Sequence, residues 1–461
     1  MISQTAVTAL SEKLGRKNVL SEKEDLLTLG YDATPGLSAL PDIAVYPTRL
    51  EELLFALQVA RDEGLAVVPR GSGTGLSGGS VPHKGGMVLC LGRMNRILEI
   101  DEANLTATVE PGVITLDLFD AVMAKGLFYP PDPGSQKVST LGGNVMENAG
   151  GLRGLKYGVT RDYVMALQCV LPDGSVIDTG GKNVKDVAGY AFKDLLVGSE
   201  GTLGVISQIT VRLIPPPRSK KTLLAYFDTM PKAGEAVTRI IAARIIPSTL
   251  EIMDRTTMIC VEEHAGIGLP LEMAALLLIE VDGHPAAVEE EATAVRTVLQ
   301  QAGAAEIKLA ADADEAASLA AARRTALSAL ARKSPTTILE DATVPRSKLA
   351  DTFAEIERLA EKYRLVVGTF GHAGDGNLHP TVLCDERDRG EMERTHAFYE
   401  ELYEKVLAWG GTVSGEHGIG LAKKAFLARQ IGPAGIAVMR RIKNSFDPRG
   451  MLNPGKIIME E

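Results

Sequence analysis

The chain of 461 residues is poor in cysteine and tryptophan, and it lacks long apolar runs. Its four cysteines lie far apart, without the close spacing of a zinc or iron–sulfur site. Three of them lie in apolar surroundings, so we expect reduced, structural thiols. No apolar run approaches the roughly 20 residues that are needed to span a bilayer. The cysteines are Cys90, Cys169, Cys260 and Cys384.

Basic residues are also in short supply. Lys and Arg number 49 against 59 Asp and Glu, which gives a formal net charge of −10. A general nucleic-acid-binding protein would carry a basic stripe, so we expect no nucleic-acid partner. The first residues lack the basic and then apolar pattern of a signal peptide. We therefore expect a cytoplasmic protein. Peripheral attachment to the inner membrane through a partner, and a homodimer, stay open.

Glycine, in contrast, is abundant, with 47 residues. Five of them fall within the nine residues of the loop Gly71–Gly79, which follows the apolar run Leu65–Val68. Successive main-chain N–H groups in such a loop form an anion-binding surface. The spacing matches neither the dinucleotide fingerprint nor the P-loop, so a plain turn and a pyrophosphate cradle both stay open.

The sequence before this loop predicts a strand, a helix and a second strand, which is the context of many phosphate sites. We expect the helix to begin with a capping box of Thr48 and Glu51 and to end at Gly64.

Pro215-Pro216-Pro217 is the clearest linker in the chain. After it glycine thins out, and strands alternate with alanine-rich helices, which favours a sheet with helices packed against it. We expect a first domain over residues 1–216, a second over 217–408, and a C-terminal segment over 409–461.

Three of the seven histidines fall in two late, glycine-rich segments. His372 and His379 are seven residues apart, so on one straight strand they would face opposite sides, and a folded-back loop is needed to bring them together. Two histidines with a carboxylate, Glu416 or Asp375, suit a divalent ion with open positions. A metal-free turn is an equal alternative. The adjacent Glu416 and His417 suggest a ligand beside a base.

Arg323 and Arg324 lie in an alanine-rich helix. The pattern alone favours a solvated cationic face, since arginines mostly lie on surfaces. A buried arginine would instead bind a carboxylate in bidentate fashion.

Several motifs together resemble the FAD-linked oxidases whose flavin domain is of the vanillyl-alcohol-oxidase type. Within that family the chain looks most like one branch. This branch includes the FAD-bound subunit of glycolate oxidase, D-lactate dehydrogenase and D-2-hydroxyglutarate dehydrogenase. The match runs in order from about Asp42 to Lys456. It rests on residues 69–79, 131–133, 141–144, 150–151, 156–158, 198–204, 371–380, 414–420 and 452–456.

The resemblance implies an α+β fold, with a FAD-binding domain of two subdomains and a cap domain of antiparallel sheet with flanking helices. It implies non-covalent FAD, because Ser72 and Thr74 stand where members with tethered flavin often carry histidine. The implied FAD-binding residues are Pro69, Arg70, Gly71, Ser72, Gly73, Thr74, Gly75, Pro131, Asp132, Ser139, Thr140, Gly142, Gly143, Asn148, Gly151, Tyr157, Gly158, Glu200, Gly201, Gly204, Ile206 and Asn453.

By the same resemblance, His372, His379 and Glu416 would ligate zinc or manganese, His417 would be the catalytic base, and Arg323 would bind the substrate carboxylate. The implied reaction is oxidation of a small 2-hydroxy acid, glycolate or D-lactate, to the 2-oxo acid. An iron–sulfur partner subunit or another acceptor would take the electrons.

Three alternatives remain for the activity. D-2-Hydroxyglutarate oxidation belongs to the same family, but its branch places a cation at the segment aligned with residues 338–341, which here holds leucine and acidic residues. A metal-dependent hydrolase and a non-haem iron oxygenase would use the same two histidines and carboxylate without flavin.

Overall fold

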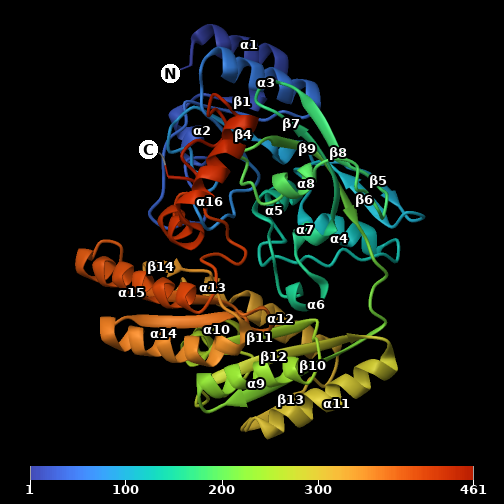
Figure 1. Cartoon of the computed structure of the whole chain (residues 1–461), viewed down its shortest axis with the longest axis vertical. Coiled ribbons are helices and arrows are strands. Elements are labelled where there is room, and N and C mark those ends of the chain that lie inside the picture. The colour runs from blue at the N-terminus through green and yellow to red at the C-terminus, as the bar shows by residue number, and fades with distance from the viewer. Residues whose placement is uncertain (1, 460–461) are drawn as a thin grey trace. The chain divides into compact units, whose positions relative to one another are not determined.

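The computed structural model describes residues 2–459, which form two compact units (Figure 1). The first unit comprises Met1–Gly150, Val159–Pro216 and Glu416–Glu461, and the second comprises Gly151–Gly158 and Pro217–Gly415. Neither unit is one continuous stretch, because the chain passes from one to the other at four points.

The first unit contains a four-stranded sheet in the order β1-β2-β4-β3, in which β2, β4 and β3 are parallel and β1 is antiparallel. The helix that the sequence predicts between β2 and β3 is present as α3. The core between the sheet and its helices is largely aliphatic and includes Ile43, Leu53, Leu57 and Leu89. The elements are α1 (Gln4–Leu14), β1 (Val19–Leu20), α2 (Lys23–Leu27), β2 (Ile43–Val45), α3 (Leu50–Asp62), β3 (Val67–Arg70) and β4 (Met87–Cys90).

The predicted capping box of α3 pairs Thr48 with the wrong acidic residue. The helix begins at Leu50, and both the amide and the hydroxyl of Thr48 donate to Glu52 at 2.9 Å. Because the helix starts two residues after Thr48, the next acidic residue, and not Glu51, turns back to it.

The C-terminal part of the chain adds to this sheet beside β3. The amide of Val67 donates to Met451 O at 2.8 Å, and the amide of Asn453 donates to Val67 O at 2.7 Å. This parallel bridge follows α16 (Lys424–Phe446), which has a kink at Gly432 where the sequence shows Gly432-Pro433.

A second, antiparallel sheet of the first unit has the order β5-β6-β9-β7-β8. Pro172-Asp173-Gly174, a run of turn-forming residues, lies between β7 and β8, which pair as an antiparallel hairpin. Its strands and helices are β5 (Ile97–Asp101), β6 (Thr106–Val109), α4 (Thr115–Met123), α5 (Leu141–Glu147), α7 (Thr160–Tyr163), β7 (Val164–Val170), β8 (Val176–Gly180), α8 (Phe192–Leu196) and β9 (Val205–Arg212).

The second unit is built on an eight-stranded antiparallel sheet in the order β13-β10-β12-β11-β16-β17-β14, with β15 also paired to β17. Its strands are β10 (Ser219–Phe227), β11 (Thr249–Asp254), β12 (Ala275–Gly283), β13 (Glu306–Leu309), β14 (Thr336–Leu339), β15 (Ala342–Thr343), β16 (Val366–His372) and β17 (Asn377–Cys384). With the two sheets of the first unit, this antiparallel sheet confirms the predicted α+β fold.

Helices accompany this sheet as the alternation of strands and alanine-rich stretches predicts. The alanine-rich helix that the sequence predicts around Arg323 and Arg324 is divided at Thr325. The helices are α6 (Gly154–Tyr157), α9 (Met230–Ala242), α10 (Arg255–Ala265), α11 (Pro285–Gln301), α12 (Ala313–Arg324), α13 (Ala326–Leu330), α14 (Leu349–Tyr363) and α15 (Arg389–Ala408).

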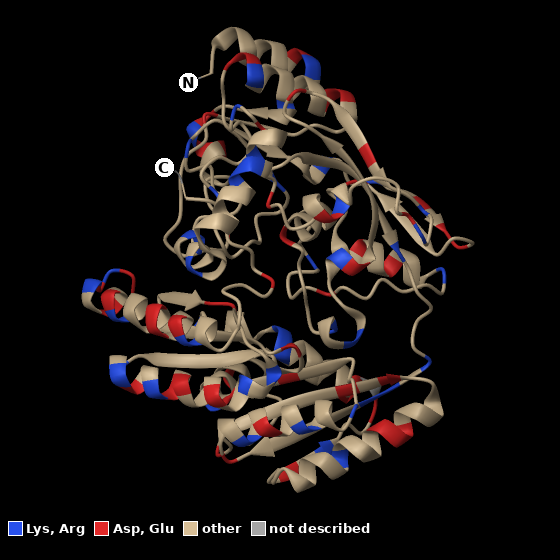
Figure 2. Cartoon of the chain, in the orientation of Figure 1, with Lys and Arg blue, Asp and Glu red and all other residues tan. Residues whose placement is uncertain are grey.

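Charges of both signs lie along α14 and α15 (Figure 2). Arg358 bonds Glu355 of its own helix at 2.8 Å and Glu401 of α15 at 2.6 Å, which links the two helices. Between residues 2 and 459, the structure contains no helix with both the length and the apolarity that a bilayer span requires.

Candidate functional site

The glycine loop begins directly after β3, and the last residue of β3, Arg70, contacts the loop with its side chain. The Arg70 guanidinium donates to Tyr31 O at 2.8 Å and to Ser80 Oγ at 3.2 Å. A Cβ on Gly73 would lie 2.0 Å from Arg70 Nη2, and a Cβ on Gly71 would lie 2.2 Å from Thr140 Oγ1. The packing of the protein itself therefore disfavours a side chain at these two positions, and the φ of +72° at Gly73 adds to this preference for glycine.

Gly75 differs from both of these glycines. The nearest atom to a Cβ placed on it is Asp32 Oδ2, at 3.9 Å, which is an ordinary contact. The protein would accommodate a side chain here, so its own packing does not explain the glycine. A bound molecule that approaches the main chain closely does explain it, and an anion held by the loop amides is such a molecule. The loop therefore fits the pyrophosphate of FAD.

Other residues of the predicted FAD set gather around this loop. Thr140, next to Gly71, caps α5 by accepting from the Gly143 amide at 3.3 Å. A Cβ on Gly201 would lie 3.2 Å from Pro69 Cγ. The Asn453 side-chain amide donates to Gly79 O at 3.0 Å and to Glu200 O at 2.7 Å.

Most of the remaining members lie in the first unit. Asn148 ends α5 in a left-handed conformation, and the buried members are Pro131, Asp132, Ser139, Gly142, Gly204 and Ile206. Gly142 and Gly204 pack against Pro111 and Cys169. Gly151, Tyr157 and Gly158 belong instead to the second unit, where the Tyr157 hydroxyl donates to Asp282 Oδ2 at 2.8 Å.

A buried lysine that the sequence reasoning left without a role ties the C-terminal segment to the loop. Lys456 Nζ donates to Gly79 O and to Asn453 Oδ1, both at 2.6 Å. Burial lowers the pKa of Lys456 to about 7, against the charges of Asp32, Glu200 and Glu147. The motif Leu452–Lys456 was the available signal, but it did not show what the lysine binds.

Glu200 holds the segment that follows the late Glu-His pair. Its two carboxylate oxygens accept from the amides of Ile419 and Gly420, each at 2.7 Å. Burial raises the pKa of Glu200, against these two hydrogen bonds and the charge of Lys456.

In the second unit, β16 and β17 form the folded-back segment that the two histidines need. Phe370 is paired with His379 and His372 with Asn377, so His372 and His379 share a face of the sheet. Their ring centroids lie 5.4 Å apart at an interplanar angle of 88°. Each offers a ligand nitrogen within 4.8 Å of the other, a spacing that suits two ligands of one ion.

Arg323, from the last turn of α12, is 4% exposed, so the solvated cationic face that the pattern favoured is wrong for this residue. It forms a 2.6 Å ion pair with Glu251 Oε2, and Glu251 Oε1 lies 2.7 Å from His372 Nδ1. The Arg323 guanidinium also lies over the Phe370 ring at 4.8 Å, and the Phe370 and His379 rings are 5.3 Å apart. These contacts close a ring of five buried residues, which we call the buried ring: Arg323, Glu251, His372, His379 and Phe370.

Sequence reasoning missed Glu251. The only signal is a lone acidic residue between Leu250 and Ile252 in an apolar strand. Burial opposes ionisation of Glu251, but the charges of His372 and Arg323 outweigh it and hold the pKa of this carboxyl below its ordinary value.

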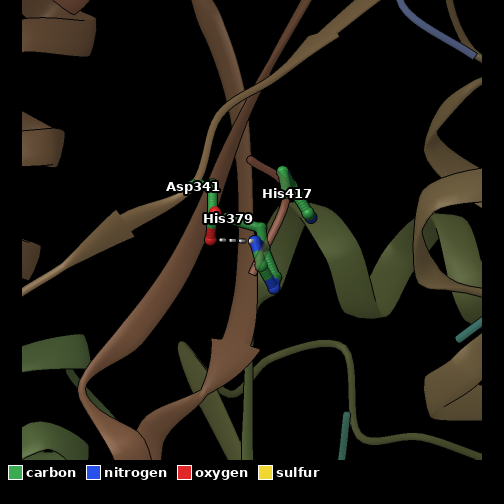
Figure 3. A group of neighbouring side chains, drawn as sticks. All are labelled: Asp341, His379 and His417. Atoms are coloured by element: carbon green, nitrogen blue, oxygen red, sulfur yellow. Dashed lines mark ion pairs between the residues drawn. The ribbon is translucent and has the colours of Figure 1, made fainter. Parts of the chain in front are cut away.

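A second buried carboxylate, Asp341, lies beside His379 (Figure 3). Asp341 Oδ1 is 3.8 Å from His379 Nδ1, and Asp341 accepts from Asn377 Nδ2 at 2.6 Å and from the Gly415 amide at 2.8 Å. Gly415 is the last residue of the second unit. The predicted ligand Glu416 and the predicted base His417 follow it directly in the chain, at the start of the last piece of the first unit.

Comparison with known proteins gives the class of this chain. Residues 41–180 match the model of a FAD binding domain, and residues 216–457 match the C-terminal domain of FAD linked oxidases. The fold agrees, because p-cresol methylhydroxylase superposes with a TM-score of 0.80 at 19% identity, covering 99% of this chain and 98% of that one. The chain belongs to the FAD-linked oxidases.

The curated relatives narrow this class. The glycolate oxidase subunit GlcD of Bacillus subtilis is 50% identical, and the match covers all 461 residues of this chain and 98% of that protein. The subunit GlcD of Escherichia coli is 38% identical, and the match covers 99% of this chain and 92% of that protein. A D-lactate dehydrogenase of Archaeoglobus fulgidus is 38% identical over 93% of this chain and 95% of its own. The protein is a FAD-linked oxidoreductase, which excludes the hydrolase and oxygenase alternatives.

Proposed function

We propose that this enzyme oxidises a small 2-hydroxy acid, glycolate or D-lactate, to the corresponding 2-oxo acid. The observation that carries the proposal is the buried ring of a flavoprotein whose relatives are named for these substrates. The ring combines a buried guanidinium, which suits a carboxylate, with two imidazoles, which suit a metal ion.

His372, His379 and Glu416 are the proposed ligands of a divalent metal, zinc or manganese. Two imidazoles and one carboxylate are a common donor set with open positions for a substrate. Glu416 is one peptide bond from Gly415, whose amide is fixed to Asp341. A metal held there would supply positive charge that lowers the pKa of the substrate hydroxyl, and bound FAD would supply the acceptor for the hydride of C2.

The residues of the chain perform the remaining work. Arg323 Nε is buried and makes no hydrogen bond within residues 2–459, so it is available to a substrate carboxylate that fixes the orientation of C2. His417 is the proposed base. With a reference pKa of about 6.5, a histidine can take the hydroxyl proton near neutral pH.

The proposal includes non-covalent FAD in the first unit, with Ser72 and Thr74 in the loop where tethering members carry histidine. It also includes a separate electron acceptor. The four cysteines of this chain are free and buried, and the relatives named GlcD are called subunits, which supports an acceptor in a partner, such as an iron–sulfur subunit.

We further propose that glycolate and D-lactate are preferred over D-2-hydroxyglutarate, whose second carboxylate needs a cation. At the segment 338–341, Glu340 accepts from the Tyr403 hydroxyl at 2.6 Å and Asp341 is buried. Lys333, the cation upstream, forms an ion pair with Glu263. An unpaired carboxylate in a partly dry pocket costs several kcal/mol.

An anaerobic screen of 2-hydroxy acids tests the proposal. Flavin bleaching by glycolate or D-lactate, with L-lactate slow, is the expected result. A protein that retains FAD but is bleached by none of them would contradict the proposed substrate class. A kcat/KM that favours D-2-hydroxyglutarate would contradict only the proposed selectivity.

A further inference from the structure

The buried carboxylate of Glu251 carries an inference that rests on the proposed function. One oxygen lies 2.7 Å from His372 Nδ1 and the other 2.6 Å from an Arg323 guanidinium nitrogen. Glu251 thus contacts both a proposed metal ligand and the proposed substrate clamp. We propose that Glu251 is a positioning residue that couples the metal site to the carboxylate site.

The chemistry of the two partners explains why a carboxylate is needed. A His372 tautomer with its proton on Nδ1 donates to Glu251, and its lone pair on Nε2 is then the one that would bind the proposed metal. Arg323 presents only donors. An ionised carboxylate has one acceptor oxygen for each, so it fixes the histidine tautomer and neutralises the buried guanidinium at the same time. Partners of this kind orient metal ligands and raise their basicity.

The geometry makes the coupling specific. Glu251 is 1% exposed, so water does not replace either partner. It comes from β11, which is paired with β16 in the register Ile252 opposite Gly371, and this pairing places it beside His372. Arg323 arrives from α12 and also contacts Phe370. A shift of the carboxylate therefore affects the imidazole and the guanidinium together.

Glu251→Gln separates coupling from mere packing. An amide has the same shape but only one acceptor oxygen, so one of the two donors must face an NH₂ group. We expect the charged Arg323 to take the oxygen, because a guanidinium cation attracts an amide oxygen more strongly than a neutral imidazole N–H does. His372 then loses its acceptor, and the affinity for Zn²⁺ should fall about 10–100-fold, as measured by titration of the FAD-bound protein against a chromophoric chelator.

The double variant Glu251→Gln/Arg323→Met gives the opposite result. Without the guanidinium the amide oxygen is free for His372, and removal of a buried pair as a unit leaves no lone charge. Zn²⁺ affinity should return towards the native value, whereas binding of oxalate, which has no C2 hydrogen to transfer, should be lost. Such non-additivity is the signature of two residues in direct contact.

Asp254→Asn is the matched control. Asp254 lies on the same strand and accepts from the amides of Thr257 and Thr369 at 2.8 Å. Within residues 2–459 it forms no hydrogen bond or ion pair with the buried ring. Its change should leave Zn²⁺ affinity native.

Native Zn²⁺ affinity in Glu251→Gln would overturn the inference, and so would a double variant that stays as weak as the single one. If Glu251→Gln does not fold, the double variant decides alone, since weakened Zn²⁺ binding in it contradicts the coupling. Failure of the proposed function looks different, because His372→Ala would then keep its metal.

Discussion

The two regions that carry the proposed chemistry are built from different parts of the chain. Around the glycine loop, the proposed flavin site depends on room beside the main chain, and its decisive positions are glycines. In the second unit, buried charges form the site, and each polar side chain is held by another. This difference teaches that substitutions in the first region should weaken FAD binding. Substitutions in the second region should instead weaken metal binding or slow the reaction.

Loss of the base should show the largest effect. His417→Ala should lower the rate of flavin reduction about 10²–10⁴-fold, because general base catalysis contributes on that order. FAD and metal content should stay native, since no ligand is removed. Stopped-flow reduction by glycolate measures the rate. His264→Ala, which changes an exposed histidine bonded to Arg332, is the control. A native rate in His417→Ala would exclude this residue as the base.

Loss of a proposed ligand should affect metal and turnover together. His372→Ala or His379→Ala should weaken metal binding by more than the about 10–100-fold expected for a supporting residue. FAD absorbance should persist, because the flavin loop lies in the other unit. Elemental analysis that finds full metal occupancy in both variants would refute the ligand assignment.

Two glycine substitutions sharpen the comparison within the first region. Gly75→Ala should leave the stability of the FAD-free protein unchanged but weaken FAD binding. An overpacked contact costs about 1–3 kcal/mol, which corresponds to about 5–150-fold in the dissociation constant.

Gly71→Ala should instead destabilise the FAD-free protein by about 1–3 kcal/mol, because its Cβ meets Thr140 Oγ1. Thermal unfolding and FAD titration of both variants measure the two effects. Equal loss of stability in both would mean that Gly75, too, serves packing.

The smallest effect, when counted per pH unit, concerns the pH dependence of stability. Burial lowers the pKa of Lys456 from 10.5 to about 7, so between these values the folded protein binds fewer protons than the unfolded chain. Its unfolding free energy should therefore rise with pH in this window, by at most about 1.4 kcal/mol per pH unit from this group.

Lys456→Met should flatten the rise. Lys424→Met, at a lysine that bonds Gly455 O, should keep it. Urea unfolding at several pH values gives the slopes, and equal slopes in Lys456→Met and the native protein would contradict the buried, titrating lysine.

Local patterns predicted much of the fold. Turn residues placed the β7–β8 hairpin, and the spacing of His372 and His379 required the folded-back segment that β16 and β17 form. The motifs also indicated the family, and with it the α+β fold.

Features that depend on contacts between residues far apart in the chain could not be predicted from the sequence. The pairing of Glu251 with Arg323 depends on sheet register and on where α12 packs, and the isolated residues carry no sign of it. For the same reason the sequence pattern favoured an exposed face for Arg323. Two short-range details also differ from expectation, because of local geometry alone. The predicted helix around Arg323 is broken at Thr325, and Thr48 donates to Glu52 instead of pairing with Glu51.

The bridge between β3 and the C-terminal segment has a consequence for synthesis. Gly79 and Lys456 are 377 residues apart in the chain, yet they share a hydrogen bond at the flavin loop. A growing chain exposes the glycine loop long before residues 453–456, which brace it, and contacts of such high sequence separation form slowly. Tight FAD loading should therefore wait for residues 453–456. The yellow colour of the protein would thus report that translation has run past this point and that the C-terminal segment has returned to β3.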